Sequence, residues 1–419
     1  MSSNLINNQM IPVQPEIWYK NHRFTIAMRI VMKPQLHLLL ILILITSACY
    51  GVRKSPIPGA GRPDLYLPLI TGKPVAVVAN QASMTGKMHI VDFLLSKGVD
   101  VKKIFAPEHG LRGVAEAGES ISDGKDAVTG LPVISLYGSH FKPTPEDLKG
   151  IDIVIFDIQD VGVRFYTYIS TLHYVMEACA ENGKMCIVLD RPNPNGFYID
   201  GNIADTSYKS FVGLHPVPIV YGMTIGEYAM MINGEKWLRG GVKCDLEVIK
   251  CKYYTNKTYY ELPVRPSPNL PNQTSVYLYP SICLFEGTSI SLGRGTPFPF
   301  QVYGSPLLPD KGFSFIPVSV PEAKNPPLAG LKCYGKDLRD AIKEKLVPSH
   351  GINLEWLIEA WQDYPHKDKF FTAYFDVLAC GPVLREQIGK GMTADQIRES
   401  WKPGLTEFRK IRAKYLLYK

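Results

Sequence analysis

The sequence lacks the features that mark a membrane-spanning or nucleic-acid-binding chain. Its strongest apolar run, Leu38–Ile45, has eight residues, whereas a helix that crosses a bilayer needs about 20. The net charge of +7 comes without a run of Lys or Arg, so we expect no nucleic-acid partner. With 46% hydrophobic and 20% charged residues, the composition excludes collagen-like, coiled-coil and wholly disordered proteins.

Several catalytic and cofactor motifs are also missing. The sequence has no G-x-S-x-G elbow, no Walker motif, no HExxH and no GxGxxG after the first expected strand. These absences argue against a serine hydrolase, a nucleotidase, a zinc protease and a dinucleotide-dependent dehydrogenase. We therefore expect no cofactor.

Cysteines are too few and too scattered to form a framework. Seven of the eight follow Cys49, which is an odd number, and no CxxC pair occurs. Neither a dense set of disulfides nor a zinc site is indicated. Cys244 and Cys251 could pair across a hairpin, but buried free thiols are the simpler expectation for most of the seven.

The N-terminal segment predicts export. The run Leu38–Ile45, with basic residues before it, suits the apolar core of a signal peptide. A Thr-Ser-Ala-Cys sequence ending at Cys49 follows and resembles a bacterial lipobox, in which the Cys is lipidated. We expect a signal or lipoprotein segment over 1–49, a tether over 50–66, and a periplasmic or membrane-anchored bacterial protein. The membrane is then contacted only through the lipid, and plain secretion stays open.

Short apolar runs alternate with amphipathic stretches after the tether. Patterns typical of buried strands occur at 74–80, 101–108, 132–137, 151–158 and 185–190, with helical spacing at 89–97 and 166–181. Such alternation predicts an α/β fold with a Rossmann-like, mostly parallel sheet that has helices on both faces. We expect this catalytic domain over 67–265 and a smaller C-terminal α+β domain over 266–419. Further helices are expected at 335–346, 353–362, 381–389 and 393–415.

Four of the apolar strand patterns end in a polar residue that is a candidate for chemistry. These residues are Asn80, Glu108, Asp157 and Asp190. In an open parallel α/β sheet, ligands bind outside the carboxyl ends of the strands. We therefore expect the four side chains to converge on one crevice, although each taken alone could equally be a loop-capping residue.

The loops after these strands are rich in side chains that bind ligands. Arg offers a fork for an anionic group, Asn and Gln offer hydrogen bonds, and Tyr offers a face for a sugar. His109 with the nearby carboxylates matches no known spacing of metal ligands, so we expect no metal. The candidates for substrate binding are Asn80, His109, Arg112, Asp157, Gln159, Asp160, Arg164, Tyr166, Asp190, Arg191, Asn193, Asn269, Glu286 and Arg294.

Several long motifs resemble those of the NamZ family of exo-β-N-acetylmuramidases. They are PEHGLRG, AGE, FDIQDVGVRFYTY, LDRPNPNG, HPVPIVYGMTIGEYAMMINGE and NLPNQTSVYLYPSICLFEGTSISLGRGTPFPF, in this order. The resemblance runs from about residue 74 to the C-terminus. It implies a Rossmann-like catalytic domain, a smaller C-terminal domain and an active site between them. It also implies that the chain removes N-acetylmuramic acid (MurNAc) from the non-reducing ends of peptidoglycan fragments.

The acidic residues fit glycoside hydrolysis, which usually needs a carboxyl that protonates the leaving oxygen and a second that attacks or activates water. Glu108 ends a strand within a Gly-rich loop, so we predict it as the acid/base. Glu119 of the AGE motif is the predicted partner. Glu116 is a weaker candidate, and Asp157 or Asp160 could take the place of Glu119.

MurNAc differs from its GlcNAc counterpart by a lactyl carboxylate, which a guanidinium would bind with two hydrogen bonds. The candidate residues are Arg112, Arg164, Arg191 and Arg294. Two other functions stay open at this point. One is an exported esterase or amidase that acts on cell-wall fragments, and the other is a lipoprotein that binds wall-derived sugars without turnover.

Overall fold

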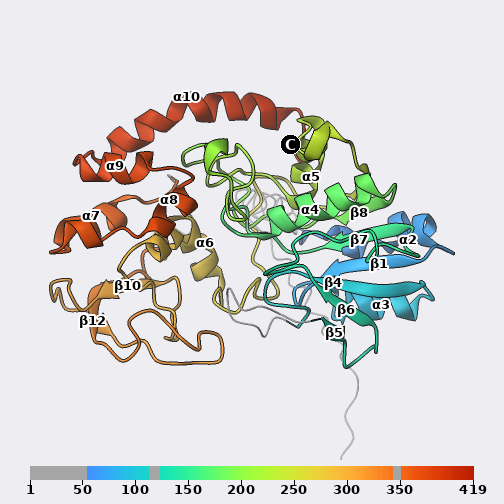
Figure 1. Ribbon diagram of the computed structural model, residues 1–419, viewed down its shortest axis with the longest axis horizontal. Coiled ribbons are helices and arrows are strands. Elements are labelled where there is room, and N and C mark those ends of the chain that lie inside the picture. The colour runs from blue at the N-terminus through green and yellow to red at the C-terminus, as the bar shows by residue number, and fades with distance from the viewer. Residues whose placement is uncertain (1–53, 113–122, 343–350) are drawn as a thin grey trace, which may run out of the picture. The chain divides into compact units, whose positions relative to one another are not determined.

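Six parallel strands and one antiparallel edge strand form the central sheet in the described part of the chain. The structure, a computed structural model, describes residues 54–112, 123–342 and 351–419. The strands lie in the order β5-β6-β4-β1-β7-β8-β9, at the right of Figure 1. Their bounds are Val75–Ala79 for β1, Val101–Ala106 for β4, Gly124–Lys125 for β5, Pro132–Ser135 for β6, Ile153–Asp157 for β7, Met185–Leu189 for β8 and Asp245–Ile249 for β9.

The six parallel strands have the arrangement of a doubly wound Rossmann sheet. Counted along the chain, they lie in the order 3-2-1-4-5-6, which is the Rossmann order. Val77 of β1 lies opposite Ile104 of β4 on one side and opposite Ile155 of β7 on the other. The winding therefore reverses between β1 and β7. The predicted Rossmann-like, mostly parallel sheet is confirmed.

Helices cover both faces of the sheet because its strands are apolar on both faces. All five residues of β1 are buried. Val75 and Val77 join one core cluster with residues of α2 and α3, whereas Ala76 and Val78 join another with residues of α4 and α5. The bounds are Pro63–Ile70 for α2, Ile90–Ser96 for α3, Tyr168–Glu181 for α4 and Ile225–Gly234 for α5.

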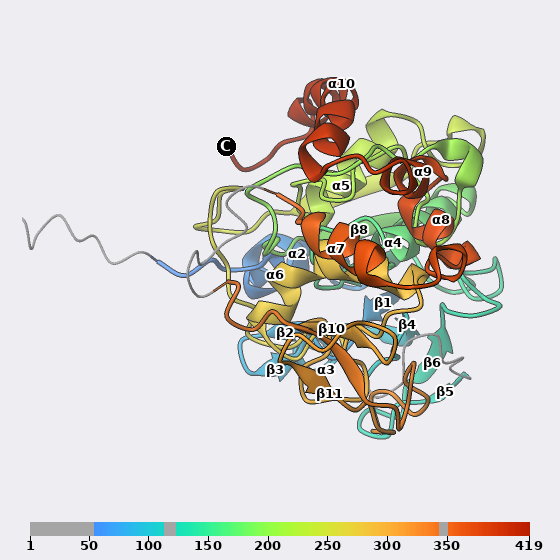
Figure 2. The same cartoon turned by 90° about the vertical axis from the view of Figure 1, so that its left-hand side faces the viewer.

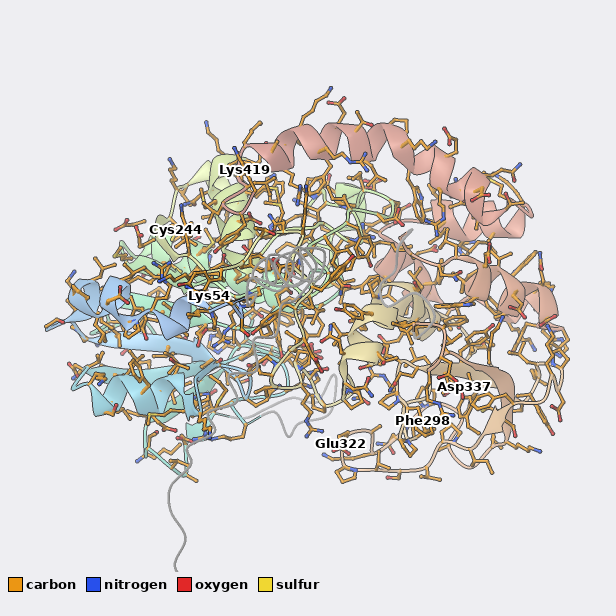
Figure 3. The ribbon with its side chains drawn as sticks, turned by 180° about the vertical axis from the view of Figure 1, so that it is seen from behind. Lys54, Cys244, Phe298, Glu322, Asp337 and Lys419 are labelled. Carbon is orange, nitrogen blue, oxygen red and sulfur yellow. The ribbon has the colours of Figure 1, made fainter. Side chains whose placement is uncertain are left out.

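The C-terminal part combines a small antiparallel sheet with a group of helices. Its strands lie in the order β10-β12-β11, and Figure 3 shows Phe298 and Asp337 close to this sheet. The bounds are Gln273–Ile282 for α6, Val302–Ser305 for β10, Ser314–Phe315 for β11, Cys333–Asp337 for β12, Glu355–Asp363 for α7, Ala373–Ala379 for α8 and Val383–Gly389 for α9. This is the α+β region that the sequence predicts.

One predicted helix in this region, 335–346, is wrong at its start. Strand β12 includes residues 335–337 and pairs with β10 and β11. Gly335 comes so close to β10 that an added Cβ would lie 1.9 Å from the Tyr303 carbonyl oxygen. Glycine therefore serves the close approach of two strands here. The end of the predicted helix lies outside the described residues.

Helix α10 (Ala394–Ala413) leads from the C-terminal helices back to α5, as Figure 1 and Figure 2 show. Beyond α10, the Tyr415 hydroxyl donates to Glu235 at 2.6 Å and the Tyr418 hydroxyl donates to Asp190 at 2.6 Å. The last residues thus fasten the C-terminal part to the Rossmann part. Residues Ser55–Lys419 form one compact unit, and the domain boundary at residue 266 stays a prediction.

The seven cysteines after Cys49 are all buried and free, so a disulfide between Cys244 and Cys251 is wrong. No helix within the described ranges is long and apolar enough to cross a membrane. The predicted signal segment with Cys49, and residues 50–53 of the anticipated tether, lie outside those ranges. The rest of the anticipated tether packs onto the Rossmann part, because α2 begins at Pro63 and the side chains of Ala60 and Tyr66 are buried in its core.

Candidate active site

A cavity of about 1040 Å³ lies between the Rossmann part and the C-terminal part. The Rossmann part supplies the loop after β4 and the start of α4. The C-terminal part supplies the residues around Glu286, the loops that follow β10 and residue Tyr374 of α8. Six of the sequence-predicted site residues line the cavity, namely Glu108, His109, Tyr166, Asn269, Glu286 and Arg294.

Glu108 is the carboxyl that the Rossmann part brings to the cavity. It follows β4 by two residues, because the strand ends at Ala106. The Thr167 hydroxyl, at the start of α4, donates to Glu108 Oε2 at 2.8 Å. Tyr137, which follows β6, also lines the cavity, and the charge of Glu108 contributes to the raised pKa of its hydroxyl after burial, the largest cause. The Thr167 hydroxyl therefore holds the carboxyl from the start of α4.

The turn after Glu108 has an uncommon backbone. His109 and Gly110 both have positive φ, 71° and 74°. For a residue with a Cβ this conformation costs energy and is often found at functional sites. The turn places the buried His109 side chain in the cavity wall, next to the predicted acid.

Glu286 is the carboxyl that the C-terminal part brings to the cavity. It lies on the short helix η4 (Cys283–Gly287) and is 22% exposed. Arg294 donates to its Oε1 from Nε at 2.9 Å and from Nη2 at 2.5 Å. The guanidinium carbon lies 5.0 Å from the centre of the Phe300 ring. Burial lowers the pKa of Arg294, but the Glu286 carboxylate outweighs this and raises the pKa overall.

Two tyrosines of the cavity lining, Tyr374 and Tyr137, feel the charges of both carboxyls. Burial raises the pKa of Tyr374, and the charges of Glu286 and Glu108 raise it further. The same two carboxyls raise the pKa of Tyr137, again after burial, which is the largest cause. Both tyrosines line the cavity, so their neutral hydroxyls can donate to or accept from a sugar.

The other three predicted arginines do not line the cavity, and each is already bound to other groups of the protein, Arg112 at the surface and the other two in the interior. Arg112 makes two hydrogen bonds to Asp126 Oδ1 and one to Oδ2. Arg164 is fully buried and donates to four backbone carbonyls, including those of Leu378 and Ala379. Arg191 forms an ion pair with Asp157 at 2.6 Å. Their expected contact with a substrate carboxylate is thus replaced by structural contacts.

The predicted convergence of Asn80, Asp157 and Asp190 with Glu108 is also corrected. Both carboxylate oxygens of Asp157 accept hydrogen bonds from Arg191. This pair lies at the point where the sheet reverses its winding. Asp190 accepts from the hydroxyls of Tyr418 and Thr224 and from two backbone amides. Of the four, only Glu108 lines the cavity. Buried polar groups here satisfy one another and not a ligand.

The remaining predicted residues shape the loops. Asn80 donates to the Tyr168 hydroxyl at 2.9 Å, Gln159 to the Pro192 carbonyl at 2.8 Å and Asn193 to the Met223 carbonyl at 2.7 Å. Asp160 is buried and accepts from the Tyr221 hydroxyl and the Gly162 amide. These four side chains lie outside the cavity lining. Tyr166 and Asn269 line it, and each also donates to a backbone carbonyl.

Glu119, the predicted partner of Glu108, and the weaker candidate Glu116 lie outside the described residues. Among the described residues, no group of three or more His, Cys, Asp or Glu is arranged to hold a metal.

Among the hydroxyl residues of the cavity that the sequence did not predict, three adjoin the carboxyls: Tyr137, Thr167 and Tyr374. Tyr137 follows a parallel strand and Thr167 lies within the FDIQDVGVRFYTY motif, so the rule that selected Glu108 could have found both. Tyr374 belongs to a part of the sequence without a recognised motif. Its place in the cavity depends on the packing of α8 against η4.

A Rossmann-type α/β fold with two carboxyls, tyrosine hydroxyls and aromatic walls around one deep cavity is suited to a glycoside hydrolase. Comparison with protein families identifies a family within this class. Residues 75–274 match the family model of the N-terminal domain of the exo-β-N-acetylmuramidase NamZ, and residues 277–418 match that of its C-terminal domain. The chain belongs to the NamZ family.

Individual relatives agree with this assignment. The peptidoglycan β-N-acetylmuramidase NamZ of Bacillus subtilis (strain 168) is 40% identical over 380 residues, which cover 85% of this chain and 89% of the relative. A crystal structure of a DUF1343 family protein from Bacteroides fragilis is 46% identical, with a TM-score of 0.80, and the match covers 87% of this chain and 99% of that one. A second DUF1343 structure from the same organism is 30% identical, with a TM-score of 0.74, over 88% and 100% of the two chains.

Proposed function

We propose that this chain is an exo-acting glycosidase that releases MurNAc from the non-reducing ends of peptidoglycan fragments, with Glu108 as the general acid. The observation that carries the proposal is the position of Glu108. It follows a parallel strand, lines the large cavity and accepts a hydrogen bond from the Thr167 hydroxyl. Membership of the NamZ family supports the substrate class.

In the proposed reaction, protonated Glu108 donates its proton to the glycosidic oxygen. The bond from the anomeric carbon to that oxygen breaks, and the bonding electrons leave with the oxygen. Positive charge develops on the anomeric carbon and the ring oxygen of MurNAc. Water adds to the anomeric carbon and gives up one proton, which yields free MurNAc and the shortened fragment, and Glu108 takes up a proton for the next turnover.

Arg294 is the proposed contact for the lactyl carboxylate. Of the four arginines considered, it alone lines the cavity. Its Nε and Nη2 atoms bind Glu286, whereas its Nη1 atom has no partner among the described residues, so one donor edge is available to an anionic group. Arg294→Ala should narrow the preference for MurNAc over GlcNAc glycosides. An unchanged ratio of kcat/KM values would place carboxylate recognition elsewhere.

The decisive experiment compares the wild type with Glu108→Gln on the disaccharide MurNAc-GlcNAc. Mass spectrometry should find free MurNAc and GlcNAc with the wild type. Because a positioned general acid contributes about 10²–10⁴-fold, Glu108→Gln should lose most turnover on this substrate. A product other than free MurNAc, or binding without turnover, would contradict the proposed reaction. A variant with nearly normal turnover would contradict the role of Glu108.

We also propose that the chain is exported and held at a membrane by a lipid on Cys49. The support is the sequence alone: a short apolar run after basic residues, then Thr-Ser-Ala-Cys ending at Cys49. The test is the partition of the protein produced in a bacterial host. The wild type should enter the detergent phase, and Cys49→Ser should not. Equal partition of both proteins would rule out lipidation of Cys49.

A further inference from the structure

We propose that Glu286 is the second catalytic carboxyl of this site, and that as a carboxylate it stabilises the positive charge developing on the MurNAc ring and accepts a proton from the attacking water. This inference rests on the proposed function. It assigns Glu286 a chemical task, where the sequence suggested only substrate binding, and it gives Glu108 a partner from the C-terminal part.

Two carboxyl groups face the cavity in the described part of the chain. Among the described residues that line it, Glu108 and Glu286 are the two with carboxyl groups. Asp157 and Asp160, the alternatives to Glu119 that the structure describes, are buried and bound to internal partners outside the lining. Glycoside hydrolysis commonly uses two carboxyls on opposite sides of the scissile bond. Here the two come from different parts of the chain and meet in one cavity.

Glu286 keeps one carboxyl oxygen open to the cavity. Arg294 donates two hydrogen bonds to Oε1. Among the described residues, Oε2 takes only a long contact from the Cys283 thiol, at 3.7 Å, and the side chain is 22% exposed. Oε2 is therefore accessible from the cavity that Glu286 lines. This is what a developing cation and a polarised water molecule require.

Close packing around η4 holds the Glu286 side chain in place. Glu286 lies on η4, which packs against α8 so closely that a Cβ on Gly287 would lie 2.3 Å from the Phe375 Cα atom. The Thr372 amide donates to the Gly287 carbonyl at 2.9 Å. The Phe300 ring lies against the Arg294 guanidinium. A charge held in place in this way stabilises a transition state without reorganisation.

The proposed step balances as follows. Glu108 gives its proton to the glycosidic oxygen, and the bonding electrons leave with that oxygen. A water molecule forms a bond from its oxygen to the anomeric carbon while Glu286 accepts one of its protons. Afterwards Glu286 releases that proton to solvent, and Glu108 takes one up. The net reaction consumes one water molecule and leaves both carboxyls in their starting forms.

The test uses two substrates that differ in leaving group: the disaccharide MurNAc-GlcNAc and 4-nitrophenyl β-MurNAc. Loss of an acid should matter less for nitrophenolate, which leaves without a proton. Glu108→Gln should therefore lose activity strongly on the disaccharide and much less on the aryl glycoside. Charge stabilisation is needed for either leaving group, so Glu286→Gln should lose kcat by roughly 10²–10³-fold on both. Added azide should restore turnover in Glu286→Ala by replacing the missing anion.

Asp376→Asn is the matched control. Asp376 also forms a carboxylate pair with an arginine, Arg385 at 2.9 Å, with a side chain 26% exposed. It lies on α8 outside the cavity lining. This variant should keep kcat on both substrates, so loss of an ion pair as such would not mimic the effect. Glu286→Asp retains the charge and should keep more kcat than Glu286→Gln, and it replaces that variant if the latter fails to fold.

The outcomes that would overturn the role of Glu286 differ from the one that would refute the proposed function. If Glu286→Gln changes only KM, or keeps kcat within a few-fold, the inference is overturned while the proposed function stands. Loss confined to the disaccharide would make Glu286 part of proton donation, which also overturns it. The inference is also overturned if variants of Glu119, and not those of Glu286, lose kcat on both substrates and regain turnover with azide. A wild type that cleaves neither substrate would instead refute the proposed function.

Discussion

Acidic side chains in this molecule differ according to what surrounds each one. Glu286 faces the cavity with an arginine at its side. Asp160 lies in the protein interior, where its Oδ2 accepts from Tyr221 and Gly162 and its Oδ1 has no hydrogen-bond partner in the described part of the chain. Burial raises the pKa of Asp160 from 3.8 to about 6, because these hydrogen bonds only partly offset the loss of water.

Asp160→Asn should change how stability depends on pH. A raised carboxyl pKa means that the folded protein holds the proton more tightly than the unfolded chain. The contribution of Asp160 to stability is therefore complete below pH 3.8 and is lost as the pH rises through about 6. Asn stays neutral, so the free energy of unfolding of the variant should rise relative to the wild type by roughly 2 kcal/mol between pH 4 and pH 7.

Urea unfolding at a series of pH values measures this difference. The two proteins should be closest in stability near pH 4, where Asp160 is protonated, and should diverge toward neutral pH. Parallel pH profiles for both proteins would show that Asp160 titrates normally.

Residue chemistry was predictable where a single local rule decides it. Glu108 was found because the carboxyl end of a parallel strand opens toward ligands. The same rule failed for Asp157 and Asp190, since their partners Arg191 and Tyr418 come from other segments. For Arg164, the backbone carbonyls that surround it belong to residues up to 215 positions away. No local pattern can show that such an arginine is already bound.

At the scale of elements, the contact between η4 and α8 fixes two cavity residues at once. Glu286 lies on η4 and Tyr374 on α8. Gly287 lets the two elements touch, since an added Cβ would lie 2.3 Å from the Phe375 Cα atom. Phe371 and Phe375 stack edge to face with ring centres 4.5 Å apart, at the start of α8. The geometry of the site therefore depends on a backbone contact.

Gly287→Ala should cost more activity than stability. The methyl group would push α8 away from η4 and displace Tyr374 relative to Glu286. A displacement of about 1 Å can cost on the order of 100-fold in rate, whereas overpacking of this kind costs about 1–3 kcal/mol of stability. The measurements are kcat on a MurNAc glycoside and the thermal unfolding midpoint.

Gly389→Ala in α9 is the control for this change. No atom lies within 4 Å of the position where its Cβ would go, and Ala is favoured over Gly in a helix by about 1 kcal/mol. This variant should keep its activity and be no less stable than the wild type. Equal activity of Gly287→Ala and the wild type would show that the site tolerates movement of α8.

Most elements were predictable because their periodicity is strong. Strands β1, β4, β6, β7 and β8 and the helices α4, α7, α9 and α10 lie close to the expected ranges, whereas β9 had no predicted counterpart. The start of β12 was assigned to a helix because nothing in Cys333–Asp337 shows that β10 and β11 pair with it on both sides. Tertiary pairing overrode the local pattern there.

At the scale of the whole molecule, the Rossmann part and the C-terminal part depend on each other. One hydrophobic core cluster contains Val154 and Phe156 of β7 together with Phe375 of α8 and Trp401 of α10. Arg164 donates to the carbonyls of the last residues of α8. The two parts thus share a core as well as the cavity, although separate family models describe them.

The shared core predicts that residues 54–419 unfold in one cooperative transition. Trp237 reports on the Rossmann part, and Trp356, Trp361 and Trp401 report on the C-terminal part. Denaturation of Trp237→Phe followed by fluorescence should give the same midpoint as far-UV circular dichroism on that variant.

Tyr418→Phe tests the coupling of the two parts, because it removes the donor to Asp190 and the acceptor of the Cys251 amide. Losing these buried hydrogen bonds costs about 1–3 kcal/mol, and both probes should shift together. A shift in only one probe, or two separate transitions, would mean that the parts fold independently and that the cavity forms by docking of two stable domains.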